Sequence, residues 1–170
     1  PAGRPAEQVL CAAAGLAATV AMTQFQNLWS TISKKLNSKQ SNGASSQGES
    51  DDATMKVAGK VAESAGYSLT REDKKKAGSL VHYGFGTAMG ALYGTMVELG
   101  PRDLRRRAYL TGLGFGGALF AGADEIAVPY LGLGPKPNET PVSSHLYGLA
   151  SHLVYGVTAG TVRKAIRAAL

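Results

Sequence analysis

Five ionisable side chains that lie within or beside apolar stretches of the chain are the strongest candidates for chemistry. These three histidines and two carboxylates are His82, Asp124, Glu125, His145 and His152. An imidazole titrates near neutral pH and can bind a metal, and a neighbouring carboxylate shifts its pKa. Three roles stay open: a structural hydrogen-bonded cluster, a site that responds to protons, and a site for a divalent metal. No His-x-x-x-His or His-Glu-x-x-His spacing favours the metal, and we expect neither a metal nor a cofactor.

The spacing of these residues predicts that they face the interior of a helical bundle. Residues three or four positions apart share one face of a helix. His82 shares a face with Gly86 and Gly90, and His152 shares one with Gly156. A face of small residues is where helices pack closely, so the polar groups on it point toward other helices.

Four stretches without formal charge are the elements that must position these residues. The first extends from Val9 to Trp29, and the others cover residues 77–97, 108–123 and 141–162. Each is flanked by charge on at least one side, and basic clusters at helix ends are typical of a membrane interface. The predicted fold class is therefore an all-α, polytopic membrane protein with a bundle of four transmembrane helices. A soluble bundle of buried helices is the alternative.

Glycines in these stretches predict how the helices pack. The chain has 22 glycines, about twice the usual share of roughly 7%. Small residues four positions apart let helix backbones approach closely in lipid, where apolar side chains gain little by meeting each other. Three stretches carry such stripes. The predicted packing residues are Gly86, Gly90, Gly94, Gly112, Gly116, Gly156 and Gly160.

The chain divides into three regions by composition. Residues 1–30 form an N-terminal segment with the first transmembrane helix, and residues 77–170 hold the second to fourth. Between them, residues 31–76 form a polar, low-complexity loop that cannot bury enough apolar surface to fold alone.

Two helical features are predicted near the end of this loop. From Met55 to Ala65, apolar residues recur at helical spacing, which indicates a short amphipathic helix on a membrane surface or against a partner. Thr70, three residues before Asp73, resembles the N-cap of the next helix.

The basic charge of the chain predicts its polar partner. The net charge is +6, and the basic residues cluster beside the apolar stretches, which favours anionic lipid head groups over nucleic acid. An ion pair between Glu98 and Arg102 is expected at one membrane face. The short arginine-rich loop at residues 102–107 favours cytoplasmic termini by the positive-inside rule.

The C-terminal half resembles the YagU-like inner-membrane proteins of bacteria. The residues that carry the resemblance, within residues 80–167, are His82, Tyr93, Glu98 and Pro101, the run Pro129–Pro135 and the run Ser151–Tyr155. The resemblance implies a multi-pass protein of the bacterial inner (cytoplasmic) membrane, with a link to acid tolerance and no established enzyme activity.

The sequence shows no phosphate-binding loop and no nucleophile elbow, so we do not expect an enzyme. The expected function is that of a structural or accessory subunit, which packs against other membrane subunits or against copies of itself. The alternative is a proton- or cation-handling membrane protein that uses the His/Asp/Glu cluster.

Overall fold

The computed structural model describes residues 5–37 and 51–169, and all regular structure within these ranges is helical. The all-α prediction is therefore confirmed for the described part of the chain. The long helices are α1 (Pro5–Asn37), α3 (Arg71–Leu99) and α7 (Val142–Ala169). Helix α5 (Ala108–Leu119) continues into the π-helix η1 (Phe120–Ala127) and then into α6 (Val128–Tyr130). Three short helices complete the chain: α2 (Ala53–Ser64), α4 (Arg102–Arg106) and the 3-10 helix η2 (Pro137–Glu139).

Local sequence signals set several helix ends. The Thr70 hydroxyl accepts a hydrogen bond from the Asp73 amide at 3.3 Å, which confirms the predicted N-cap of α3. Asp52 caps α2 in the same way through the amide of Met55, at 2.8 Å. Helix α3 ends at Leu99, where Gly100 takes an extended conformation before Pro101. Helix α1 continues past the predicted end of its apolar stretch, to Asn37.

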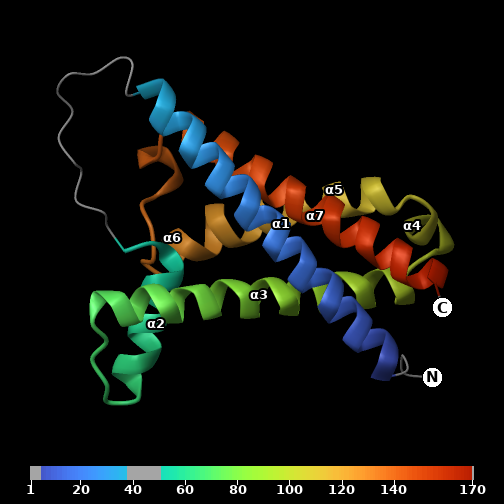
Figure 1. The fold of residues 1–170 in the computed structure, drawn as a ribbon, viewed down its shortest axis with the longest axis horizontal. Helices are drawn as coiled ribbons and strands as arrows, with labels where there is room; N and C mark the ends of the chain where they lie inside the picture. Colours follow the sequence, from blue (N-terminus) through green and yellow to red (C-terminus); the bar gives the residue numbers. More distant parts are fainter. Residues whose placement is uncertain (1–4, 38–50, 170) are drawn as a thin grey trace.

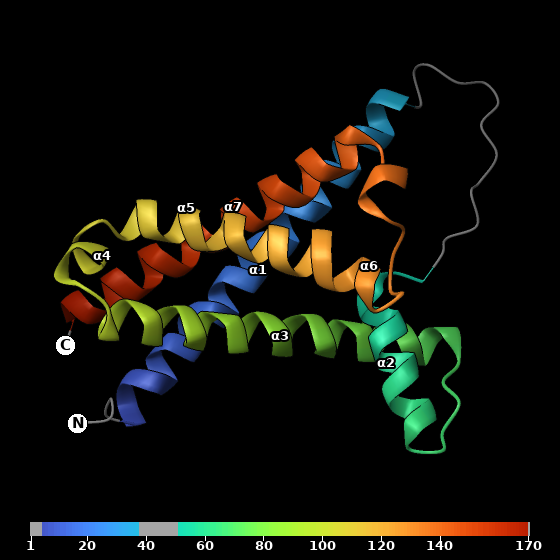
Figure 2. The same ribbon diagram turned by 180° about the vertical axis from the view of Figure 1, so that it is seen from behind.

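The long helices form two crossing pairs that meet along α1 and α7. Helix α1 crosses α3, α7 crosses α5, and α1 lies beside α7, as Figures 1 and 2 show from opposite sides. The start of α1, the end of α7 and the short α4 lie at one end of the bundle (Figures 1 and 2). Helix α2, α6 and the start of α3 lie toward the other end.

Glycines at both crossings bring the helix backbones into contact. A Cβ added at Gly15 would lie 2.7 Å from the Cα of Gly90, a separation that real Cβ atoms do not show. At the other crossing, Gly112 faces the backbone of Gly156. All seven glycines predicted to pack lie at these two crossings. Their contacts are Gly86 with Thr19, Gly90 with Gly15, Gly94 with Cys11, Gly112 with Gly156, Gly116 with His152, and Gly160 with Ala108.

The interior of the bundle combines small, apolar and a few polar residues, and several large apolar side chains stay exposed. Fully buried positions include Ala18, Thr19 and Ser151, with Tyr93 and Tyr155 as the largest buried side chains. The outer face of α3 exposes apolar residues at helical spacing. These residues are Phe85, Leu92, Met96 and Leu99, the last of them 78% exposed. The usual burial preference of a water-soluble domain is thus reversed on this face.

Among residues 5–37 and 51–169, no helix combines the length and the mean hydropathy of a membrane-crossing segment.

The amphipathic helix α2 packs inside the chain. Met55 lies against Gly78 of α3, and the Lys60 ammonium donates a hydrogen bond to the Leu131 carbonyl at 3.0 Å. Its buried face includes Met55 and Ala58, so α3 takes the place of the predicted membrane surface or partner. The middle of the predicted loop, residues 38–50, lies outside the described residues.

Candidate functional site

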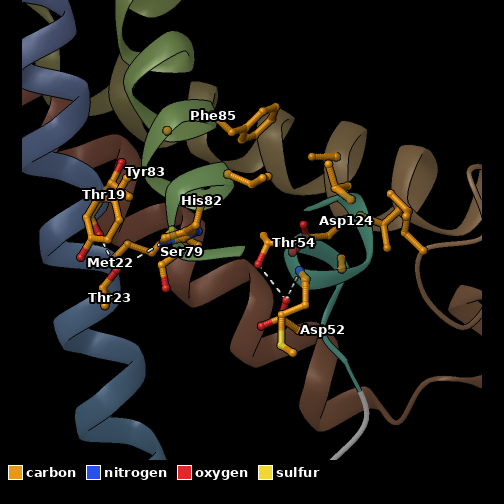
Figure 3. A pocket seen from close by; sticks show the side chains of 18 of the residues that line it. Thr19, Met22, Thr23, Asp52, Thr54, Ser79, His82, Tyr83, Phe85 and Asp124 are labelled. Atoms are coloured by element: carbon orange, nitrogen blue, oxygen red, sulfur yellow. Dashed lines mark hydrogen bonds between the residues drawn. The ribbon is translucent and has the colours of Figure 1, made fainter. Parts of the chain in front are cut away.

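The predicted cluster of five ionisable residues divides into two groups. His82, Asp124 and His152 line one cavity of about 980 Å³, which is bounded mainly by α1, α2, α3, η1 and α7. Figure 3 shows His82 and Asp124 in this cavity. His145 and Glu125 pair with each other and do not line this cavity. Asp124 and Glu125 follow each other in the π-helix η1, where their different directions separate the two groups.

His152 is the most buried member of the cavity group, with 6% of its surface exposed. Its Nδ1 donates a hydrogen bond to the Gly148 carbonyl at 3.0 Å and lies 3.6 Å from Oδ2 of Asp124. The Phe120 ring lies 5.9 Å from the imidazole, centroid to centroid. Gly148 leaves room for this arrangement, because a Cβ there would meet the Phe120 ring. The sequence placed His152 two turns deeper than Asp124. In the structure, Gly116 contacts His152 and Gly148 lies beside Asp124, so the two side chains come together.

His82 is held from the opposite helix by a threonine. The Thr23 hydroxyl donates to the Thr19 carbonyl at 2.9 Å, and its oxygen lies 3.2 Å from Nε2 of His82. Because the hydroxyl has a single proton, His82 donates through Nε2 to Thr23. The close approach of α1 and α3 at Gly86 and Thr19, one turn away, brings these two residues within reach.

Several cavity residues were not predicted from the sequence. The Tyr155 hydroxyl, buried beside the cavity, donates to the Gly86 carbonyl at 2.5 Å and so links α7 to α3. Thr23 and Asp52 also line the cavity, the latter from the start of α2 (Figure 3). The spacing of Asp52 before Met55 resembles an N-cap and could have located the start of α2, but no sequence signal places α2 beside His82.

The second group joins η1 to the loop before α7. His145 Nδ1 lies 2.7 Å from Glu125 Oε1, and its Nε2 lies 3.0 Å from the Pro137 carbonyl oxygen. Both ring nitrogens therefore face acceptors, an arrangement that only the doubly protonated imidazolium satisfies. The hydrogen bond to Glu125 raises the pKa of His145 above its usual value. This ion pair ties the loop around Pro137 to η1.

The His145 and Glu125 pair predicts a specific pH dependence of stability. The pKa of His145 is raised in the folded state. The pair therefore makes its full contribution to folding stability below the ordinary pKa of about 6.5. That contribution is lost as the pH rises through the raised folded value. We expect thermal unfolding of the purified chain to show a smaller fall in midpoint from pH 6 to pH 9 in His145→Gln than in the unchanged protein. Glu125→Gln should have the same effect, and an unaltered pH profile in both variants would contradict it.

At the other end of the bundle, the Glu98 carboxylate forms ion pairs with arginines from two helices. Glu98 Oε1 lies 2.5 Å from Arg163 Nη1 and 2.7 Å from Arg167 Nη1, both of α7. Arg105 of α4 lies 3.8 Å from the other carboxylate oxygen and donates to the Glu98 carbonyl. The predicted partner Arg102 makes no ion pair with Glu98 within the described residues. The reason is that α3 ends at Leu99, so Glu98 and Arg102 do not share one helix face.

A metal centre would need several His, Asp, Glu or Cys side chains close together. In the part of the chain that the structure describes, no three such side chains are arranged to hold a metal ion.

Comparison of this chain with protein-family models, with curated proteins and with solved structures finds no significant match. The resemblance to YagU-like proteins is therefore carried only by the residues given above.

Proposed function

We propose that this chain is an integral protein of the bacterial inner membrane that acts as a structural or accessory subunit of a larger membrane complex. Four spans would lie within α1, α3, α5 with the first residues of η1, and α7 from Leu146 to Val162. His145 and Glu125 then lie at the membrane interface, beside the α2 end of the bundle. The protein would perform no catalysis of its own.

The observation that carries this proposal is the close glycine packing at both helix crossings, together with large apolar side chains that stay exposed on α3. In lipid, helices associate through close packing of small residues, and polar side chains face one another inside the bundle. The structure has glycines at both helix crossings, His152 and Arg163 in the interior, and Leu80 and Leu99 more than three-quarters exposed. Glycines, hydroxyls and histidines lower the mean hydropathy of these helices. Gly86, Gly90, Gly112 and Gly156 face other helices, whereas Gly84, Gly114 and Gly117 face open space.

Basic residues at one end of the bundle support a membrane interface there. Arg102, Arg105 and Arg106 lie on α4, and Lys164 and Arg167 lie near the end of α7. Lys164 also lies over the Tyr109 ring, 5.6 Å from its centroid. Arginine, lysine and tyrosine together are typical of the head-group region, and anionic lipid would be the matching partner. The resemblance to YagU-like proteins agrees with an inner-membrane location. The short arginine-rich loop favours cytoplasmic termini by the positive-inside rule.

A single charge on the outer face tests the membrane location. Leu92 of α3 is about half exposed, so Leu92→Arg is nearly neutral if water covers this face. Lipid instead imposes a cost of roughly 2.5–3.5 kcal/mol for arginine near the centre of a span. We therefore expect Leu92→Arg to lower the fraction that stays in the membrane pellet after an alkaline carbonate wash. The matched control is Val61→Arg on α2, which is exposed outside the proposed spans. If the carbonate wash releases equal fractions of Leu92→Arg and Val61→Arg, the proposal is contradicted.

Copurification tests the accessory role. After gentle detergent extraction, a tagged chain is expected to bring down another membrane protein, or further copies of itself, in a fixed ratio. A lone monomer after extraction would contradict a subunit role. Detergent can remove a partner, so the control is chemical cross-linking in intact membranes before extraction.

The second candidate, a proton-handling membrane protein, is favoured by one observation. His82, Asp124 and His152 come from three helices and line the same cavity. Proton uptake by liposomes that contain the purified protein tests this candidate. The His152→Ala, Asp124→Asn double variant should abolish the signal, and an unchanged signal would exclude the cluster.

A further inference from the structure

We propose that the cavity between α1, α2, α3, η1 and α7 binds an organic ammonium ion that carries an apolar tail. The cavity volume of about 980 Å³ is in the upper range of small-molecule sites in proteins. Its walls combine a few polar groups with large apolar side chains. This inference goes beyond the proposed subunit role, because a folded bundle can bind such a ligand in a bilayer or in detergent.

The two histidines offer acceptors to a ligand in the cavity. His82 donates through Nε2 to Thr23, which leaves the lone pair of Nδ1 on the neutral ring. His152 donates through Nδ1 to the Gly148 carbonyl, which leaves the lone pair of Nε2. Within the described residues, neither of these two remaining nitrogens has a hydrogen-bond partner. A ligand that donates hydrogen bonds therefore fits this pair better than one that accepts them.

Asp124 supplies the negative charge. Its side chain lines the cavity and is 42% exposed, and the nearby His152 nitrogen, at 3.6 Å, is already donating to Gly148. The other lining carboxylate, Asp52, accepts from the Met55 amide and from the Thr54 hydroxyl through one oxygen as the N-cap of α2. The ammonium group would thus bind Asp124 in the part of the cavity that His152 and His82 also line.

Cationic side chains lie away from this position. Arg71 and Lys75 of α3 also line the cavity, but Lys75 is seven residues before His82, about 10 Å along the helix. They lie toward the start of α3, at the outer end of the bundle, and each already has an interaction partner. The inner part of the cavity therefore carries the acceptors without a fixed cation.

Apolar and aromatic side chains of the cavity would contact the apolar tail of the ligand. Met22 of α1, Phe85 of α3 and Leu119 of α5 line the cavity beside the polar group. Tyr83 and Tyr155 also line it, and aromatic faces attract ammonium ions. A primary alkylammonium could contact both the polar groups and the apolar side chains of the cavity. A bare metal ion would leave the apolar side chains without contact.

Three ligands with the same tail and different head groups test this proposal. Hexylammonium, hexanol and hexanoate are titrated by calorimetry into the purified full chain in detergent, at pH 8. An alkylammonium, like lysine, keeps its charge at this pH. We expect hexylammonium to bind at least about tenfold more tightly than the other two, because hydrogen bonds between charged groups are the stronger ones. Equal or weaker binding than hexanol or hexanoate would overturn the proposal.

A pair of charge-neutralising variants locates the site. Asp124→Asn should weaken hexylammonium binding at least about tenfold, while Glu125→Gln, next in sequence and outside the cavity, should change it less than about twofold. Equal losses in both variants would overturn the assignment to Asp124. If Asp124→Asn does not fold, the comparison of the three ligands on the unchanged protein still decides the ligand class. Tighter binding of Zn²⁺ than of hexylammonium would identify a metal site and overturn the proposal. These titrations need no membrane, so their failure is separate from failure of the proposed location.

Discussion

Glu98→Ala is expected to destabilise the bundle by about 3–5 kcal/mol, because it leaves a buried guanidinium without its counter-charge. Arg163 is only 5% exposed, and its Nε already lacks a hydrogen-bond partner within the described structure. Loss of the carboxylate would leave the Nη1 group unpaired as well. Arg167 is half exposed and can turn to solvent, so most of the cost falls on Arg163. Thermal or denaturant unfolding of the purified protein measures the effect.

Two further variants separate the buried pair from the surface charges. Adding Arg163→Met to Glu98→Ala should recover part of the lost stability, since the double variant has no unpaired charge in the interior. Arg102→Ala should change stability by less than about 0.5 kcal/mol, because Arg102 is exposed and makes no ion pair with Glu98. A double variant as unstable as the sum of both single variants would contradict this account.

Gly90→Ala and Gly84→Ala, both on α3, are expected to change stability in opposite directions. At Gly90 an added Cβ overlaps with the backbone of Gly15, and a backbone cannot turn aside as a flexible side chain can. We expect a net loss of about 2 kcal/mol from overpacking, or roughly 4–8 °C in the unfolding midpoint. At Gly84 nothing lies within 4 Å of the added Cβ, so the higher helix propensity of alanine should add up to about 1 kcal/mol.

The comparison of these two glycines tests the helix crossing directly. Both substitutions add the same methyl group to the same helix, so any difference comes from α1. Stabilisation by Gly90→Ala would show that α1 and α3 do not meet at Gly15.

Much of the helical structure could be predicted from local patterns. The Thr70 cap, the amphipathic helix α2 and the helical nature of the four apolar stretches depend on residues within one or two turns of each other. The glycine stripes also predicted which helix faces meet other helices. They did not identify the partners, because Gly90 and Gly156 carry the same signal and differ only in the helix that each meets.

The candidate site was less predictable. The sequence placed His82, Asp124 and His145 at one end of the bundle, and placed His152 two turns away. The sequence also placed Glu125 at that end, together with its partner His145, but the structure brings His152 to Asp124. The packing of α5 and η1 against α7 decides this, because it sets which side chains of the two segments come within reach of each other.

The sequence alone determined that this chain forms apolar helices with small-residue faces that carry histidines and acids, since periodicity and caps are local properties. Only the tertiary structure decided which helices pair, where the cavity lies, and that Glu98 meets Arg163, 65 residues away, rather than Arg102. The physical reason is that ion pairs and cavities depend on the crossing of helices distant in sequence. One break in α3 at Gly100 and Pro101 was enough to remove the nearest arginine from the face of Glu98.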